Sequence, residues 1–517
     1  MFTELLFSFF LLILSLFSIL FTSKNSITRH KKTIPSSPTN NLLPKSYPII
    51  GSYFAIYANR ERRVEWLSDM IKLSPSATFV LDRFFGQHQV FTGNPSNVQH
   101  VLKTHFGIYP KGELLRCSLH DFLGDGIFNI NGDAWKFQRQ VSSHEFNRKS
   151  LRKFVEHVVD TEVSGRLVPM LASAAKTGAV LDLQDILQRF TFDNICKIAF
   201  GYDPAYLLPS LPPAQFAEAF EEAVMISSGR LNSILPIIWK LKRFLCMGSE
   251  KRLKKAVSQV RGFARDLIRE KKEKIRERRL QDVDLELDIL SRFLMSGHSD
   301  EDFVIDIVIS FIHAGRDTTS AALTWFFWLV SQNPRVEREI LDEIAEKTGT
   351  QLAVYEETKD MVYTHASLCE SMRLYPPVPV DTKEATVDDV LPDGTRVKKG
   401  TRVVYHPYAM GRLPELWGSD WPEFRPERWL AEGGGGGKWG FVGRDPYEYP
   451  VFQAGPRICL GKEMAFLQMK RVVAAVLGRF RVVPDMGKGT EPAYSADLTS
   501  KMKDGFPVRI QERNGLL

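Results

Sequence analysis

The stretch FQAGPRICLGKE, residues 452–463, decides which fold is expected of this 517-residue chain. It holds one cysteine, Cys459, among glycines and arginines. The whole chain has only five cysteines, and none belongs to a CxxC pair. Cysteines so few and so scattered argue against a disulfide framework and favour a reducing compartment. The other four are interpreted as small buried apolar residues, so the role of Cys459 has to be sought among its neighbours.

The residues around Cys459 are those that an iron-bound thiolate requires. Backbone N–H groups aimed at the sulfur tune its electron donation, and Gly455 and Gly461 allow the backbone to approach closely. We expect Phe452 to pack against the sulfur. Arg457 offers a planar guanidinium that fits a carboxylate through two hydrogen bonds. The alternative is a buried cysteine with a purely structural role.

The string FQAGPRICLG resembles the haem-binding loop of the cytochrome P-450 monooxygenases, F-x-x-G-x-R-x-C-x-G, at every specified position. The resemblance implies a cytochrome P-450 fold, which is mainly α with a small β-sheet subdomain. It implies haem b as the cofactor, with the Cys459 thiolate as the axial ligand of the iron. It also implies that Arg457 pairs with a haem propionate.

Further motifs of that family follow in the expected order along almost the whole chain. In the family, the Glu and Arg of ESMR (Glu370 and Arg373) and the Arg of PERW (Arg428) form a buried ion network. The segment WKFQR places Trp135 and Arg139 four residues apart on one helix face, and the family uses both for the haem propionates. Taken alone, ExxR is commonly a surface pair and WKFQR an amphipathic surface helix.

Two further positions bear on how the haem is held. Lys383 follows the ExxR helix where the family often has another basic partner for a propionate; this assignment is weaker than the others. Animal fatty-acid ω-hydroxylases often have a Glu that bonds covalently to haem where this chain has Ala314. We therefore expect non-covalent attachment, with Cys459 as the only protein ligand of the iron.

The segment HAGRDTT lies in the middle of a long apolar helix predicted over Asp302–Ser331. Polar residues inside such a helix cost free energy unless they are satisfied or functional. The segment resembles the oxygen-activation motif of the family, which implies that Thr318 hydrogen-bonds iron-bound oxygen and Asp317 supplies protons. Gly315 is expected to permit a local opening of the helical ladder that makes room for dioxygen and water. A helix N-cap is the alternative role for these polar residues.

Helical periodicity dominates the rest of the body. Helices are predicted over Arg148–Leu171, Pro213–Met225 and Lys251–Arg279. Strand signals near residues 78–93 and 401–408 predict a small sheet beside them. No linker interrupts residues 52–517, which are therefore expected to form one catalytic domain. The basic helix within it lacks aromatic stacking residues, so we expect no nucleic-acid partner.

The N-terminus predicts a membrane anchor. Residues 5–22 carry no charge and are just long enough to cross a bilayer. Basic residues follow them and place the remainder in the cytosol, whereas a cleaved signal peptide would carry its charges on the other flank. We assign residues 1–23 to the anchor and 24–51 to a proline-rich linker, stiff or disordered. The expected location is the endoplasmic reticulum membrane, and the net charge of +7 suits an anionic lipid surface.

The substrate is predicted from a finer resemblance. Segments such as DDVLPDGTRVKKG and YPVFQAGPR resemble the plant clan of fatty-acid ω-hydroxylases, in particular the group that acts on fatty acids and jasmonoyl–amino acid conjugates. Selectivity for the chain end requires a narrow channel. Lys111 or Arg116 offers a cation for the carboxylate, although a solvated surface cation is the simpler interpretation. The channel residues implied by family position are Phe128, Phe311, Ala314, Val378, Val380 and Leu498.

The reaction implied is hydroxylation of a fatty acid at or near the ω carbon. Dioxygen is the co-substrate, and electrons come from NADPH through a separate reductase. Three alternatives remain: oxidation of jasmonoyl-isoleucine-type conjugates, a dioxygen-independent haem-thiolate isomerase or dehydratase, and a non-catalytic haem-binding sensor. The presence of both Asp317 and Thr318 argues against the isomerase, because such relatives commonly lose this pair.

Overall fold

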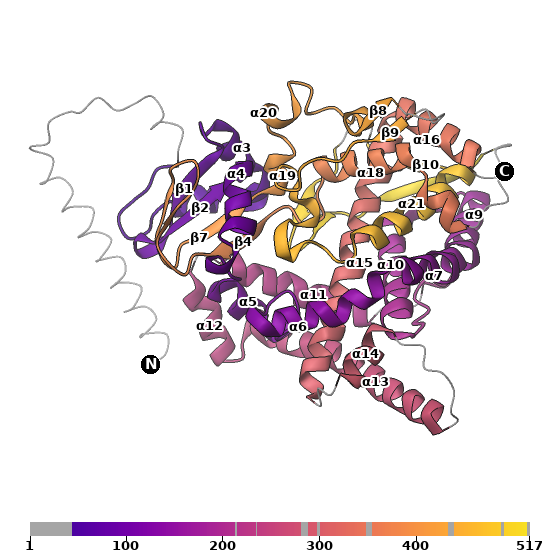
Figure 1. Ribbon diagram of the computed structural model, residues 1–517, viewed down its shortest axis with the longest axis horizontal. Coiled ribbons are helices and arrows are strands. Elements are labelled where there is room, and N and C mark those ends of the chain that lie inside the picture. The colour runs from indigo at the N-terminus through magenta and orange to yellow at the C-terminus, as the bar shows by residue number, and fades with distance from the viewer. Residues whose placement is uncertain are drawn as a thin grey trace, which may run out of the picture. The chain divides into compact units, whose positions relative to one another are not determined.

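One long helix, α15 (Glu301–Gln332), runs through the helical part of the protein in the computed structural model (Figure 1). Its 32 residues make it roughly 48 Å long. The side chain of Asp300 caps its start by accepting a hydrogen bond from a backbone N–H, and acidic residues in the first turn complement the helix dipole. Most side chains between residues 304 and 330 are buried. The prediction of a core-crossing helix is therefore confirmed.

The structure describes residues 44–211, 215–233, 235–280, 288–296, 300–347, 354–432, 439–487 and 491–513. Residues 45–517 make up one structural unit, which includes the end of the predicted linker, where Tyr47 and Gly51 form a β-bridge. The predicted anchor at residues 1–23 lies outside the described residues. Within them, no helix combines the length and apolar character needed to span a bilayer.

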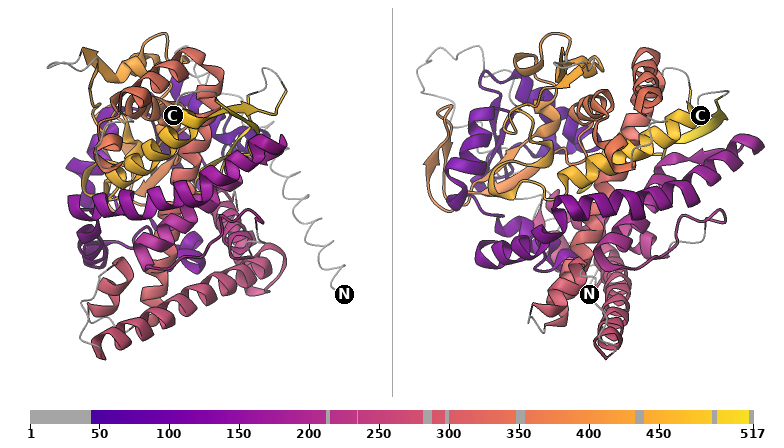
Figure 2. Two further views of the ribbon diagram at one scale, coloured as in Figure 1. Left: turned by 90° about the vertical axis from the view of Figure 1, so that its right-hand side faces the viewer. Right: turned by 45° about the vertical axis from the view of Figure 1, so that its right-hand side comes forward.

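Helices from distant parts of the sequence surround α15. They are α10 (Leu183–Phe200), α11 (Gln215–Leu231), α13 (Gly248–Leu280), α18 (Val362–Leu374) and α21 (Lys462–Arg479). Two of them, α11 and α13, match the helices predicted near residues 213–225 and 251–279. In both views of Figure 2, α13 runs along the outer edge of the helical part. It buries one apolar face and keeps i,i+4 ion pairs such as Lys274–Glu270 on the other, as its sequence predicts.

The third predicted helix, near residues 148–171, is longer and less regular than expected. It is built from α7 (Arg148–Lys153), α8 (Asp160–Glu162) and α9 (Val168–Thr177), joined by two π-helical segments. Pro169 near the start of α9 lacks a backbone N–H, so a regular α-helical ladder cannot pass through it. The other α-helices of the described residues are α2 (Tyr53–Ala58), α3 (Arg63–Leu73), α4 (Pro95–Gln99), α5 (Glu113–Leu123), α6 (Gly132–Ser143), α12 (Pro236–Phe244), α14 (Ile289–Met295), α16 (Pro334–Lys347), α17 (Val354–Lys359), α19 (Pro407–Met410) and α20 (Pro414–Trp417).

A four-stranded sheet lies beside the helices, in the order β1 (Thr78–Asp82), β2 (His88–Thr92), β7 (Arg402–Tyr405) and β4 (Asp381–Glu384) (Figure 1). The hairpin β1–β2 and strand β7 lie where the sequence predicted strands. Strands β2 and β7 pair in parallel although some 300 residues separate them, and β4 pairs antiparallel with β7. Alternate residues of β2 and β7 face the interior of the molecule, and those residues help to build the site.

The other sheets are small. A three-stranded sheet joins β10 (Phe480–Pro484), β13 (Pro507–Glu512) and β3 (Val180–Asp182). Three two-stranded sheets consist of β11 (Tyr494–Ala496) with β12 (Ser500–Met502), β5 (Asp389–Val390) with β6 (Arg396–Val397), and β8 (Leu430–Glu432) with β9 (Trp439–Phe441). The architecture is therefore mainly helical with small sheets, as predicted.

Candidate active site

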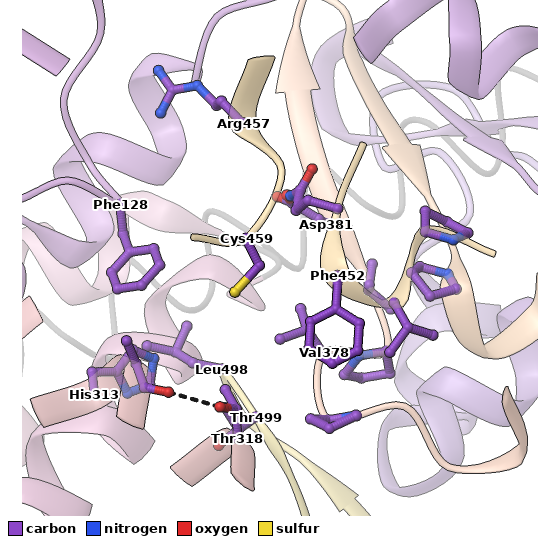
Figure 3. Close-up of a pocket in the computed structure, with 18 of the residues that line it drawn as sticks. Phe128, His313, Thr318, Val378, Asp381, Phe452, Arg457, Cys459, Leu498 and Thr499 are labelled. Carbon is purple, nitrogen blue, oxygen red and sulfur yellow. Dashed lines mark hydrogen bonds between the residues drawn. The ribbon is translucent and has the colours of Figure 1, made fainter. Parts of the chain in front are cut away.

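Cys459 lies in a tight loop directly before the N-terminus of α21. Its backbone N–H donates a 2.8 Å hydrogen bond to the carbonyl of Phe452, which closes the loop. The sulfur points into an internal cavity, where Phe128, His313 and Leu498 lie around it (Figure 3). The accessible surface of Cys459 therefore faces this cavity.

Two opposing influences act on the Cys459 thiol. Burial dominates and raises its pKa, whereas the backbone N–H groups of Gly461 and Lys462 and the guanidinium of Arg139 act to lower it. The two N–H groups belong to the first turn of α21, where the helix dipole is positive. This is the arrangement of donors that stabilises a thiolate ligand once a metal ion binds it.

Gly455 is required by the shape of the loop. Its φ of +65° lies in the left-handed region, and a Cβ there would lie 2.1 Å from the carbonyl oxygen of Leu102. Only glycine avoids both the strain and the collision. At Gly461, in contrast, a Cβ would meet its neighbours at ordinary contact distances of 3.6 Å and more.

Cationic and aromatic side chains from α6 lie beside the cysteine loop. The guanidinium of Arg457 stacks 4.4 Å from the ring of Trp135 and donates 2.9 Å hydrogen bonds to the backbone of Ile130 and the side chain of Asn131. Arg139 lies 5.9 Å from the same ring, and burial lowers its pKa. Trp135, Arg139 and Arg457 all line the cavity, so the structure brings these three predicted site residues to one place.

Lys383 occupies a different position from these three. Its ammonium lies 3.2 Å from Asp381 and does not line the cavity, whereas Asp381 does. Burial lowers the pKa of Lys383 to about 7, although Asp381 opposes this shift. Lys111, on the other side of Asp381, lines the cavity and pairs with the same carboxylate at 3.1 Å. A propionate in this region would therefore meet Lys111 and Asp381 before it reached Lys383.

Asp381 and Gln453 are site residues that the sequence analysis missed. Tyr405 donates a 2.8 Å hydrogen bond to the Asp381 carboxylate, and the Gln453 amide also donates to it. Burial opposes ionisation of Asp381, but the ammonium groups of Lys111 and Lys383 hold its pKa well below its usual range. The acidic residue directly after PPVPV was the one local signal, because an isolated carboxylate beside an apolar run needs partners.

Thr318 lies on α15 with its side chain at the cavity (Figure 3). Its hydroxyl donates a 2.7 Å hydrogen bond to the carbonyl of Ala314, one turn earlier. Because the hydroxyl proton is used in this way, the lone pairs of the oxygen remain available to a donor in the cavity. Thr318 is therefore placed to accept a hydrogen bond from a water or another protonated group there.

Asp317 does not line the cavity. It is completely buried, accepts a 2.9 Å hydrogen bond from Arg316 and lies 3.2 Å from the ring of His313. Burial opposes its ionisation, but Arg316 and His313 hold its pKa well below its usual range. His313 itself lines the cavity. This residue links Asp317 to the cavity, and its i,i+4 spacing from Asp317 is the signal that could have identified it.

Gly315 differs from its expected role. The helix is regular on both sides of it, and a Cβ there would lie 2.6 Å from the side chain of Ile195 on α10. Its small size lets α10 and α15 pack closely. The structure shows no local opening of the helix at Gly315. The side chain of Ile195 fills the space beside this glycine instead.

Glu370, Arg373 and Arg428 form one buried network. Nε and Nη2 of Arg373 each donate a 2.8 Å hydrogen bond to Glu370, and Arg428 donates to the same carboxylate at 3.2 Å. The indole N–H of Trp429 donates to Glu370 at 2.9 Å, and Arg373 also donates to the carbonyl of Gly411. The network ties α18 to the segments around residues 411 and 428.

The cavity has a volume of about 470 Å³, within the range of small-molecule sites. Its lining is mostly apolar. All of the channel residues proposed from sequence line it: Phe128, Phe311, Ala314, Val378, Val380 and Leu498. Arg116 does not line it and lies 4.0 Å from Glu113 and 3.6 Å from Asp125.

These residues fit a haem. Cys459 supplies a soft ligand of the kind that iron in haem accepts. Arg139 and Arg457 supply cations at the side of the cavity where carboxylates would be recognised. Ala314 leaves the α15 wall without a carboxylate at that position. A haem bound here would be held by the sulfur and by non-covalent contacts.

Comparison with known proteins agrees with this chemistry. The sequence profile of the cytochrome P-450 family matches residues 43–506. The chain is 61% identical to cytochrome P-450 94A2 of Vicia sativa, with 99% of each chain covered. It is 63% identical to cytochrome P-450 94A1 of the same plant over 92% of each chain, and 46% identical to cytochrome P-450 94B1 of Arabidopsis thaliana over 96% of this chain and 95% of that one. The chain therefore belongs to the cytochrome P-450 family of haem monooxygenases, within its 94 group.

Proposed function

We propose that the protein hydroxylates fatty acids at or near the ω carbon, using dioxygen and electrons from NADPH that a separate reductase delivers. One observation carries the proposal: the channel residues chosen from sequence line a single, mostly apolar cavity into which the Cys459 sulfur points. Such a lining favours an alkyl chain over a polar substrate.

The cavity supports selectivity for the end of a chain. Phe128 and Leu498 lie on one side of the Cys459 sulfur, and Phe452 and Val378 on the other (Figure 3). Terminal C–H bonds are the strongest of an alkyl chain, so attack there must be enforced by position. These bulky apolar groups line the cavity that would also hold the haem, so an alkyl terminus is the part of the substrate that fits best there.

A haem held by the Cys459 thiolate would supply the activation of dioxygen. The chain's own residues provide the surroundings. Thr318 presents a hydroxyl oxygen to the cavity, and His313 connects the cavity to the buried Asp317 carboxylate. Apolar side chains exclude bulk water, so protons are restricted to these polar groups.

The proposed site of action is the cytosolic face of the endoplasmic reticulum membrane. Besides the predicted anchor, α12 supports contact with lipid. Ile237, Leu241 and Phe244 are 67%, 56% and 85% exposed, and Lys242 and Arg243 lie among them in the sequence. An exposed apolar face with neighbouring cations is typical of a helix that lies at a membrane surface.

Product analysis tests the proposal. Microsomes that contain the protein and a reductase are supplied with NADPH and either saturated fatty acids of several chain lengths or jasmonoyl-isoleucine, and the products are identified by mass spectrometry. The proposal predicts acids hydroxylated at or near the ω carbon, and no product without NADPH or dioxygen. Turnover of jasmonoyl-isoleucine alone would show conjugate oxidation instead. Turnover without NADPH would show an isomerase or dehydratase.

A further inference from the structure

Three arginines from separate parts of the chain line the same cavity as Cys459. Arg63 is the first residue of α3, Arg83 follows β1, and Arg402 is the first residue of β7. Each side chain is partly accessible, and each is among the residues that form the cavity wall.

These three guanidinium groups lack an acidic partner. Within the part of the chain that the structure describes, no carboxylate lies within 4.0 Å of any of them. When the Gln89 amide is oriented so that both its oxygen and its nitrogen have suitable partners, its oxygen accepts hydrogen bonds from Arg402 at 3.0 and 3.2 Å. Asp497 attracts Arg63 without forming an ion pair. The other cations considered for a carboxylate are paired, since Lys111 binds Asp381 and Arg116 lies near Glu113 and Asp125.

The arrangement is electrostatically unfavourable for the empty protein. Burial, together with the neighbouring charges of Arg83 and Arg63, lowers the pKa of Arg402 to about 9, although the more distant carboxylates of Glu384 and Asp381 oppose this shift. Burial and the charge of Arg83 likewise lower the pKa of Arg63 to about 10. Both values stay above neutral pH, so the groups remain cations and repel one another. A cluster of partly buried like charges that stability alone would disfavour is characteristic of a ligand site.

We propose that Arg63, Arg83 and Arg402 form the subsite that binds the carboxylate of the substrate, an inference that rests on the proposed function. A carboxylate would accept charge-assisted hydrogen bonds from the guanidinium groups and neutralise their repulsion. The carboxylate of a fatty acid and that of a jasmonoyl–amino acid conjugate share this chemistry.

The cavity wall next to the cluster suits the rest of such a substrate. Strand alternation places Phe91 on the same sheet face as Gln89, and Val404 on the same face as Arg402. The apolar pair Phe91 and Val404 therefore lies next to the polar pair Gln89 and Arg402 along the cavity wall. A substrate whose carboxylate is held by the arginines would lay its alkyl chain along this wall. Fixing one end of the substrate in this way leaves the opposite end free to reach the iron.

The haem propionates have partners elsewhere in the cavity. Trp135 and Arg139 come from α6, and Arg457 comes from the cysteine loop. The arginine cluster comes from α3, β1 and β7. These are separate sets of residues, and the anion each of them binds can be tested separately.

The test measures binding through the change in the iron absorption spectrum that occurs when substrate displaces water. Laurate, jasmonoyl-isoleucine and the methyl ester of each are titrated into the purified holoprotein. Arg402→Gln, Arg63→Gln and the double variant are compared with wild type. The matched control is Arg396→Gln, which removes the same charge from an exposed position on β6. Haem content is determined for every variant.

We expect wild type and Arg396→Gln to bind the acid form of at least one substrate more tightly than its ester. In Arg402→Gln the affinity for that acid should fall about 10-fold, and in the double variant about 100-fold, with unchanged ester affinity and haem content. Arg402→Lys, which keeps the charge, should retain part of the preference. The cluster binds the carboxylate of whichever substrate, laurate or jasmonoyl-isoleucine, no longer binds more tightly as the acid than as the ester in these variants.

Two results would overturn the inference: variants that keep the preference of wild type for acid over ester, or variants that lose haem, which would assign the cluster to the propionates. Failure of the proposed function looks different. In that case wild type yields no hydroxylated acid, whatever the arginine variants bind.

Discussion

Gly455 shows at the scale of one residue why a motif position tolerates a single amino acid. The left-handed backbone and the approach to the carbonyl of Leu102 are separate constraints that coincide there. The first is shared with many turn glycines. The second is specific to this loop, because Leu102 belongs to a segment more than 350 residues earlier.

Gly455→Ala should therefore destabilise the protein by more than a backbone effect alone. Gly178→Ala serves as the control, because Gly178 has a φ of +67° and nothing within 4 Å of its would-be Cβ. We expect about 1 kcal/mol for Gly178→Ala and about 1–3 kcal/mol more for Gly455→Ala, measured by thermal unfolding of the holoprotein. Equal losses would show that the contact with Leu102 is not a constraint.

A second prediction at the scale of one residue concerns the hydroxyl group of Thr318. Removal of its hydroxyl should leave haem binding intact, because its hydrogen bond is to the helix backbone. The proton supply at the cavity should suffer, so electrons from NADPH should appear as peroxide at the expense of product. The measurement is product formed per NADPH consumed in Thr318→Ala, with Thr318→Ser as control. Unchanged coupling in Thr318→Ala would contradict the role given to the hydroxyl.

At the scale of elements, buried charge holds the core segments in register. Glu370 and Arg373 are fully buried on α18, and their partners come from the segments around residues 411, 423 and 428. The two side chains satisfy one another and several backbone groups, so the network fixes these segments against α18.

Arg373→Met should cost about 3–5 kcal/mol, because it leaves the Glu370 carboxylate buried without its main partner. Arg479→Met removes one side of the exposed pair with Glu512, at 3.2 Å, and should cost at most about 1 kcal/mol. Thermal unfolding and haem content of both variants measure the difference. A loss in Arg373→Met as small as that of the control would mean that the network does not hold these segments.

At the scale of the whole molecule, buried histidines make stability depend on pH. His406 is fully buried, and its Nδ1 accepts a hydrogen bond from the backbone of Ala409. Burial lowers its pKa from 6.5 to about 3, and burial lowers that of His365 to about 3 as well. The unfolded chain thus binds more protons than the folded one between these values. Stability should fall as the pH is lowered from about 6.5 towards 3.

His406→Asn keeps an acceptor at the same place and removes the titration. Its stability at neutral pH is expected to be lower, because the side chain is smaller. Its loss of stability between pH 6.5 and 4 should be about 3 kcal/mol smaller than that of wild type. Denaturant unfolding across this pH range measures the slope, with the exposed His120→Asn as control. Parallel slopes for wild type and His406→Asn would contradict the assignment.

The fold and much of the site could be predicted because their signals are local. Helix α15 is apolar all round over many turns, and the residues around Cys459 lie within one short string. The arginine cluster could not be predicted, because Arg63, Arg83 and Arg402 come together only through tertiary contacts: α3 packs on β1 and β2, and β2 pairs in parallel with β7. Asp381, too, acquires its partners Lys111 and Gln453 only through tertiary contacts.

The central claim is that the Cys459 sulfur is the axial ligand of a haem iron. The most direct test is the absorption spectrum of the reduced carbon monoxide complex of wild type and Cys459→Ala. Cys246→Ala, at an exposed cysteine, serves as the control. We predict a thiolate-type Soret band for wild type and Cys246→Ala, and its loss in Cys459→Ala. A thiolate-type band that persists in Cys459→Ala, or a wild-type protein without one, would contradict the account.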